Sequence, residues 1–271
     1  MFVSDPLVFL ELQKTGCTHI AKQLARVLPG KQVGKHNRLP PHLADGKRQI
    51  VGSIRNPWDW YISLWAYGCD RRGALYHRLT SRKQWLFTLL TNPALAIRRL
   101  PQERQKPQRA WRNAYTSVDD PQVFREWLYL MFDADRKHDI GEGYGRTAIS
   151  SFAGLLTFRY IYLYSRDIRE LAQQPDLIRN LDDLRAFDRQ NNVLDAIIRN
   201  EQLEDDLIDV LRQCGVNLTE AQIHAIRSAK KTNTSSRKRG VEYYYDRETL
   251  ELVRSKDQFI IDKHGYAMPS L

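Results

Sequence analysis

The feature of this sequence that most constrains its fold is a short apolar run that leads directly into a helix near the start of the chain. Residues 8–12 predict a buried strand, and residues 13–17 predict a polar turn around Gly16. Residues 18–28 carry apolar side chains at helical spacing, and a Pro-Gly pair ends that segment. A strand, a loop and a helix in this order are typical of an α/β protein.

A second strand and helix follow in the same order. Residues 49–54 predict a strand, and Asn56 and Pro57 suit the cap and the first position of a helix that extends to about residue 67. Strands that alternate with helices indicate a parallel sheet with helices on its faces. We therefore expect one α/β domain over residues 1–271, with a central, mostly parallel sheet flanked by helices and a P-loop-like strand–loop–helix unit.

The rest of the chain carries weaker signals for secondary structure. The alternation of β-forming residues predicts strands over residues 158–164 and 196–198. Helices or buried segments are predicted over residues 124–132, 203–215, from 219 onward and over 246–259. Residues 230–240 form a polar, basic loop without core residues.

Positive charge is concentrated in one part of the chain. The formal net charge is +10, and residues 71–112 contain eleven Lys and Arg residues against Glu103 alone. Such a charge attracts anions, for example a phosphorylated cofactor, an acidic glycan, a lipid headgroup or nucleic acid. We interpret residues 71–112 as a basic insertion that forms part of an acceptor cleft or a lid, and the three prolines between residues 92 and 107 predict that this stretch contains a loop. The alternative is a solvated basic face.

The cysteines and the hydropathy exclude some protein classes. Cys17, Cys69 and Cys214 are too few and too far apart to form a disulfide framework or a zinc site. No run of about 18 apolar residues predicts a membrane span, and the first residues lack the features of a signal peptide. We expect a cytoplasmic protein, and a peripheral membrane contact stays open.

The first candidate binding motif is the loop Lys14-Thr-Gly-Cys-Thr18. The first N–H groups of a helix have no partners within the helix, so a loop that precedes a helix can bind an anion. Gly16 permits a close approach, Thr15 and Thr18 carry hydroxyls, and Lys14 adds a positive charge. The motif differs from the Walker pattern, in which the lysine follows the second glycine. The alternative is an ordinary turn with a surface lysine.

The second candidate motif begins at Arg55, directly after the strand over residues 49–54. Ligands of open α/β sheets bind at the carboxyl ends of the strands. Asn56, Asp59 and Ser63 follow at helical spacing, so Arg55 and Ser63 can converge on one phosphate. The alternative gives Arg55 a carboxylate partner and Ser63 a hydrogen bond within its own helix.

Together the two motifs resemble those of sulfotransferases that use 3′-phosphoadenosine 5′-phosphosulfate (PAPS), and most closely the carbohydrate-type and bacterial members. The loop from Lys14 to Thr18 resembles the 5′-phosphosulfate loop of that family, and Arg55 with Ser63 resembles its 3′-phosphate motif. Residues 198–206 and 233–238 resemble two later segments. The resemblance implies these cofactor-binding residues: Lys14, Thr15, Gly16, Cys17, Thr18, His19, Arg55, Ser63, Arg237 and Lys238.

The sequence departs from the family pattern at several positions. Gln13 stands where many members have proline, and His19 stands where many cytosolic members have a tryptophan that stacks on adenine. The basic run after Ser236 leaves open which residue meets the 3′-phosphate.

The resemblance implies transfer of a sulfuryl group from PAPS to a hydroxyl, with 3′,5′-adenosine bisphosphate as the product. The acceptor expected is a carbohydrate or glycoconjugate. Lys14 would stabilise the charge on the leaving oxygen, and no metal is expected. The general base expected is His36, since histidine titrates near neutral pH, with His42 or a carboxylate as the alternatives. Two alternatives are a kinase-like nucleotide-dependent transferase and a basic nucleic-acid-binding protein. The first lacks a Walker lysine, and the second leaves the two phosphate motifs unexplained.

Overall fold

The computed structural model describes residues 1–166, 168–174, 176–230 and 236–271 of the chain. Within these residues, the chain divides into two compact units, and each unit is built from separate stretches of sequence. Unit 1 contains residues 1–56, 159–169 and 184–234, and unit 2 contains residues 57–158, 170–183 and 235–271. Each unit is described by itself.

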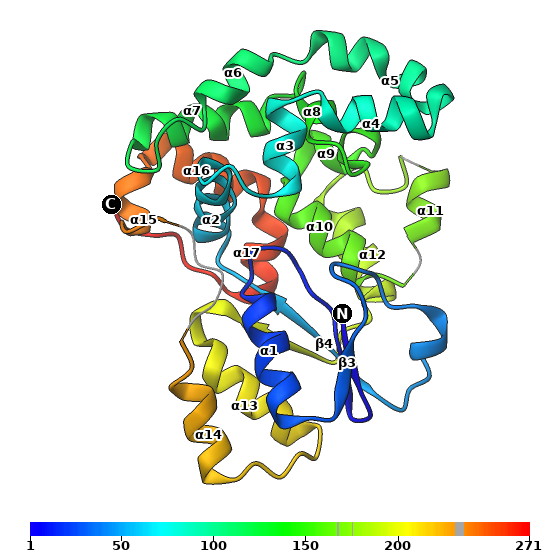
Figure 1. Cartoon of the computed structure of the whole chain (residues 1–271), viewed down its shortest axis with the longest axis vertical. Coiled ribbons are helices and arrows are strands. Elements are labelled where there is room, and N and C mark those ends of the chain that lie inside the picture. Colours follow the sequence, from blue (N-terminus) through cyan, green and yellow to red (C-terminus); the bar gives the residue numbers. More distant parts are fainter. Residues whose placement is uncertain (167, 175, 231–235) are drawn as a thin grey trace. The chain divides into compact units, whose positions relative to one another are not determined.

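Unit 1 contains a five-stranded sheet with helices packed against it (Figure 1). Its elements are β1 (Phe2–Ser4), β2 (Leu7–Phe9), α1 (Cys17–Val27), β3 (Gly30–Gln32), η1 (Pro41–Leu43), β4 (Gln49–Ile54), β5 (Ala196–Arg199), η3 (Asn200–Gln202), α13 (Leu203–Gln213) and α14 (Glu220–Arg227). The strand order is β3-β1-β2-β4-β5. This arrangement confirms the α/β class.

The prediction of a mostly parallel sheet is wrong, because the sheet is mixed. β2, β4 and β5 are parallel neighbours, whereas β1 pairs antiparallel with both β2 and β3. Only Asp5 and Pro6 separate β1 from β2, and so short a connection can join only antiparallel strands. The sequence analysis missed β1 and β3, which have three residues each.

The predicted order of strand, loop and helix and the second strand are present as β2, α1 and β4, although β2 spans Leu7–Phe9 and not residues 8–12. Residues 196–198 lie in β5. The P-loop-like character of the unit stays a prediction. Side chains of α1, α13 and α14 pack with β2 and β4 into one buried cluster. The predicted cap of α14 is present, because the Thr219 hydroxyl accepts from the Gln222 N–H while the Gln222 side chain accepts from the Thr219 N–H. This core holds the loop between β2 and α1.

Unit 2 is helical (Figure 1). Its elements are α2 (Pro57–Cys69), α3 (Ala74–Thr80), α4 (Lys83–Thr91), α5 (Pro93–Gln105), α6 (Gln108–Asn113), α7 (Pro121–Phe132), α8 (Lys137–Ile140), η2 (Tyr144–Arg146), α9 (Ile149–Phe152), α15 (Val241–Tyr244), α16 (Arg247–Lys256) and α17 (Gln258–His264). Three further helices have residues in both units: α10 (Leu155–Tyr164), α11 (Ile168–Gln173) and α12 (Leu181–Asn191).

Buried tryptophans with satisfied N–H groups form much of the core of unit 2. The indole N–H of Trp58 donates to the Leu250 carbonyl, and that of Trp65 donates to the Ala114 carbonyl. The Trp127 indole donates to the Tyr115 hydroxyl. Because a buried polar group without a partner is costly, these bonds fix α2 and α7 against their neighbours.

Two predicted elements are wrong. Residues 158–164 lie in the helix α10, not in a strand. Most of these aromatic and branched side chains are buried, so tertiary packing overrides their preference for strands. Residues 93–105 form the helix α5, not a loop, with Pro93 at its first position and Pro101 inside it. Across the described residues, no helix has both the length and the apolar character to cross a bilayer.

Candidate functional site

The loop between β2 and α1 ends at Gly16, whose backbone is left-handed. Gly16 has φ 80° and precedes α1, which has no side-chain cap at its N-terminus. The first helical bonds run from the N–H groups of His19 and Ile20 to the Gly16 carbonyl. The N–H groups ahead of them, at Cys17 and Thr18, are the donors that a helix N-terminus offers to an anion.

Residues that follow β5 pack directly against this loop. A Cβ added at Gly16 would lie 2.7 Å from the Asn200 side-chain nitrogen and 2.7 Å from a methyl carbon of Leu203. Leu203 is itself buried in the core. Gly16 is therefore required for both its backbone angle and the space that it leaves.

The hydroxyl of Thr15 is used inside the protein. Thr15 is fully buried, and its hydroxyl donates to the Leu12 carbonyl at 2.8 Å and lies 2.6 Å from the Ser53 hydroxyl of β4. The side chain therefore ties the loop to the sheet, and the backbone N–H is the group that Thr15 offers to a ligand.

The two sequence motifs meet within unit 1. The Arg55 guanidinium donates to the Lys14 carbonyl at 3.2 Å. The next N–H, that of Asn56, donates to the Glu201 carboxylate at 2.7 Å. The segment after β5 thus contacts the first motif through Asn200 and the second through Glu201. The sequence analysis singled out residues 198–206 only as a resemblance and assigned no role to either residue.

His36 lies close to the strand end that leads into the first motif. Its Nδ1 is 2.8 Å from the Glu11 carbonyl oxygen. A carbonyl can only accept, so Nδ1 carries the proton and the neutral ring keeps its lone pair on Nε2. Burial lowers the pKa of His36 below its ordinary value, which favours this neutral form. His42 is exposed in η1.

Two of the predicted site residues have strained backbones. Lys14 has φ 67° and His36 has φ 56°, and positive φ is uncommon outside glycine. Such strain tends to occur at functional sites. The sequence analysis missed Lys35, whose ammonium donates to the Thr18 hydroxyl at 3.2 Å and adds a cation beside α1.

Two other predicted cofactor residues point their side chains into the protein. Cys17 is 6 % exposed and belongs to the core cluster, and His19 is 2 % exposed with its Nε2 3.5 Å from the Gln23 side chain. Because the His19 ring is buried, it exposes little surface on which an adenine could stack. Cys17 can take part through its backbone N–H, whereas the N–H of His19 already donates to the Gly16 carbonyl.

Ser63, Arg237 and Lys238 belong to unit 2. Arg237 forms an ion pair of 2.7 Å with Asp59 on α2. Asp59 and Ser63 are four residues apart and therefore share one face of that helix. Arg237 thus lies at the helix that carries Ser63, whereas Lys238 is exposed. Residues 233–235 of the resembling segment lie outside the described residues.

The basic segment 71–112 folds as helices α3 to α6. Its apolar centre does not form a continuous core, because Phe87 is 66 % exposed and Leu90 is 84 % exposed. Trp111, at the end of the segment, is fully buried.

One group of side chains in unit 1 has the composition of a metal site. Glu11, Cys17 and His36 bring an oxygen, a sulfur and a nitrogen within 4.8 Å of one another. Zinc accepts these ligand types, but it binds the thiolate. Burial, followed by the charge of Glu11, raises the pKa of the Cys17 thiol to about 11, so the thiol keeps its proton at neutral pH. The expectation that no metal takes part stays a prediction.

Comparison with protein-family models, with curated proteins and with solved structures finds no match for this chain.

Proposed function

We propose that this chain is a sulfotransferase that moves a sulfuryl group from PAPS to a hydroxyl of a carbohydrate or glycoconjugate acceptor. The observation that carries the proposal is the hydrogen bond from Arg55 to the Lys14 carbonyl, because it brings the first residue of the second motif onto the first motif within unit 1. The uncapped N-terminus of α1 and the left-handed Gly16 support a phosphate-binding loop there.

The proposed reaction is an in-line displacement at sulfur. The acceptor oxygen forms a bond to sulfur while the bond between sulfur and the bridging phosphate oxygen breaks. Lys14 stabilises the negative charge that develops on that bridging oxygen. His36 accepts the proton of the acceptor hydroxyl at Nε2, because Nδ1 already carries the proton that it donates to the Glu11 carbonyl. This hydrogen bond supports His36 over His42 as the general base.

The remaining residues bind the nucleotide. The N–H groups of the loop from Thr15 to Thr18 surround the 5′-phosphosulfate, and Lys35 adds charge beside Thr18. Arg55 and Ser63 bind the 3′-phosphate, together with Arg237 or Lys238. The Arg237–Asp59 pair supports a role for Arg237 near Ser63. The chemistry needs no metal ion in this scheme.

Calorimetric titration with 3′,5′-adenosine bisphosphate, in the presence of a chelator, tests the cofactor. We expect saturable binding that Arg55→Ala weakens by about tenfold or more, since charge-assisted bonds are lost. Arg26→Ala, on the exposed last turn of α1, is the control and should bind like the parent. If the folded protein does not bind 3′,5′-adenosine bisphosphate, the proposal is wrong. Titrations with ATP plus Mg²⁺ and with duplex DNA test the kinase-like and nucleic-acid alternatives.

Transfer is tested with PAPS labelled in its sulfuryl group and a panel of glycan acceptors. Lys14→Ala should keep the affinity for the bisphosphate and lose about a hundredfold or more in rate, because this lysine acts on the leaving oxygen. An unchanged rate in Lys14→Ala would exclude the proposed role of that lysine.

A further inference from the structure

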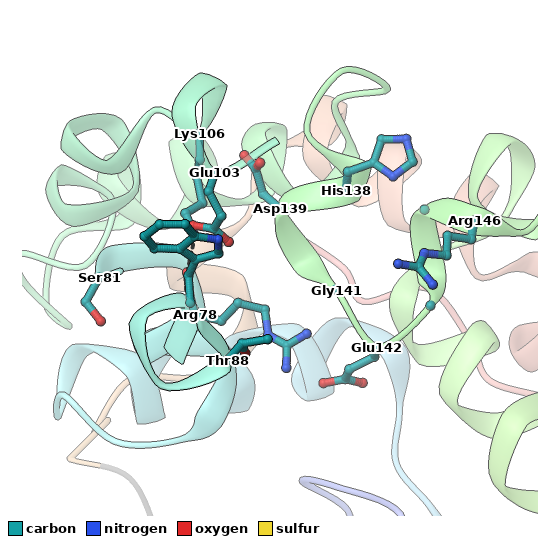
Figure 2. A pocket seen from close by; sticks show the side chains of 13 residues that line it. Arg78, Ser81, Thr88, Glu103, Lys106, His138, Asp139, Gly141, Glu142 and Arg146 are labelled. Carbon is teal, nitrogen blue, oxygen red and sulfur yellow. Dashed lines mark hydrogen bonds and ion pairs between the residues drawn. The ribbon is translucent and has the colours of Figure 1, made fainter. Parts of the chain in front are cut away.

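A cavity of about 300 Å³ lies within unit 2, in the basic segment and the loops beside it (Figure 2). Helices α3, α4, α5 and α8 and the glycine-rich stretch of residues 141–146 supply its lining. This volume is at the lower end of the range for small-molecule sites, so the cavity suits a small ligand with a single ring.

The glycine-rich stretch has an unusual backbone. Gly141, Glu142 and Gly143 have φ values of 74°, 58° and 89°. A left-handed conformation at a residue other than glycine costs about 1–2 kcal/mol, so the surrounding structure must hold Glu142 in place. Gly141 packs directly against the Arg78 guanidinium, where an added Cβ would overlap it. Arg78 and this glycine-rich stretch are therefore in direct contact and together form one part of the cavity lining.

Three of the charged groups in the lining, those of Lys106, Glu103 and Asp139, are already used by the protein. The buried Lys106 ammonium donates to the Glu103 carboxylate at 2.6 Å and to the Arg78 carbonyl at 2.8 Å. The Asp139 carboxylate accepts from the buried Trp111 indole at 3.0 Å. Because their hydrogen bonds are made within the protein, these groups stabilise the walls of the cavity and are less available to a ligand.

Arg146 differs from these groups. Its side chain is exposed, and in the described part of the chain no hydrogen bond or ion pair is recorded for its guanidinium. Figure 2 shows this guanidinium directed toward the space in front of Gly141 and Glu142. A planar guanidinium in such a position suits a carboxylate, which it can bind through two parallel hydrogen bonds.

The opposite side of the lining is aromatic and hydroxylic. The Trp85 indole is half-buried, and its N–H donates to the Ala96 carbonyl at 3.0 Å, which fixes the ring. Ser81 and Thr88 also line the cavity, and Figure 2 shows both on the side away from Arg146. A fixed aromatic face together with hydroxyl and carboxylate groups provides contacts for the apolar face and the hydroxyls of a sugar ring.

We propose that this cavity binds a carboxylate-bearing sugar ring, with the carboxylate on Arg146, one ring face on Trp85 and ring hydroxyls near Ser81 and Glu142. The site goes beyond the proposed transfer reaction and does not depend on it. It assigns to the cavity a ligand class, acidic saccharides, that follows from the residues that line it.

Ligand-observed NMR titration with D-glucuronate tests the site, with D-glucose and acetate as comparison probes. We expect saturable binding of glucuronate, and binding at least about tenfold weaker for glucose and acetate, because each probe lacks one half of the contacts. Arg146→Gln should weaken glucuronate binding by about tenfold or more. Arg104→Gln, on the exposed part of α5 outside the lining, is the matched control and should leave the affinity unchanged.

Trp85→Leu separates the sugar contact from the charge contact. It should weaken glucuronate binding and leave acetate binding as it is. Three outcomes would overturn the proposal: no saturable binding of glucuronate, equal binding of acetate and glucuronate, or an unchanged affinity in Arg146→Gln. A parallel titration of the same variants with 3′,5′-adenosine bisphosphate reports on the proposed transferase separately, so the two proposals fail independently.

Discussion

Replacing Gly16 by alanine tests the structure of the proposed phosphate-binding loop, and a second glycine offers a matched control. Gly16 and Gly215 both have a left-handed backbone, with φ values of 80° and 76°. A Cβ at Gly16 would lie 2.7 Å from both Asn200 and Leu203, whereas a Cβ at Gly215 would have nothing within 4 Å. The two substitutions thus share the backbone strain and differ in the clash.

The expected magnitudes follow from these two contributions. Left-handed strain in alanine, offset by the lower entropy of the unfolded chain, leaves a cost of about 1 kcal/mol at Gly215. At Gly16 the buried Leu203 has little room to move, which adds about 1–3 kcal/mol of overpacking. For a chain of this size, 1 kcal/mol lowers the melting temperature by roughly 2–4 °C. We expect a decrease of about 3 °C for Gly215→Ala and of about 6–12 °C for Gly16→Ala.

Differential scanning calorimetry of the two variants and the parent measures the stability, and titration with 3′,5′-adenosine bisphosphate measures the function. Gly16→Ala should also weaken nucleotide binding, because the clash shifts the loop N–H groups, while Gly215→Ala should bind like the parent. Equal melting temperatures for the two variants would refute the packing of Asn200 and Leu203 on Gly16. Parent-like nucleotide affinity in Gly16→Ala would refute the role of the loop.

Four further results are expected. The rate of transfer should fall as the pH drops through the pKa of His36, which lies below the ordinary value of 6.5. A fall in rate that begins at a pH above 6.5 would argue against His36 as the base. Stability should also decrease as the pH falls below about 6.5, since the folded protein binds this proton more weakly than the unfolded chain. Tyr61→Phe removes the buried hydrogen bond of 2.6 Å to Asp257 and should lower the free energy of unfolding in urea by about 1–3 kcal/mol, against no change for the exposed Tyr129→Phe. Arg237→Gln should weaken binding of the bisphosphate by about tenfold, and an unchanged affinity would exclude Arg237 from the 3′-phosphate site.

Local sequence signals predicted the elements that depend on neighbouring residues. The strand over residues 49–54, the helix that begins at Pro57 and the capped helix after Thr219 are all present, because apolar runs, proline at a first helical position and a capping box act over a few residues. The same signals failed for residues 158–164, where aromatic side chains favour a strand in isolation and a buried helix in the fold.

The sequence by itself determined the α/β class, the strand–loop–helix around Gly16 and the residue types of both candidate phosphate motifs, since each follows from spacing within one stretch of chain. Only the tertiary structure decided the antiparallel pairing of β1, the bond from Arg55 to the Lys14 carbonyl and the inward orientation of Thr15, Cys17 and His19. It also brought Arg78, Trp85 and Arg146 around one cavity. These features join residues far apart in the chain, and the free energy that selects them comes from burial and hydrogen bonding across the fold, which no local pattern encodes.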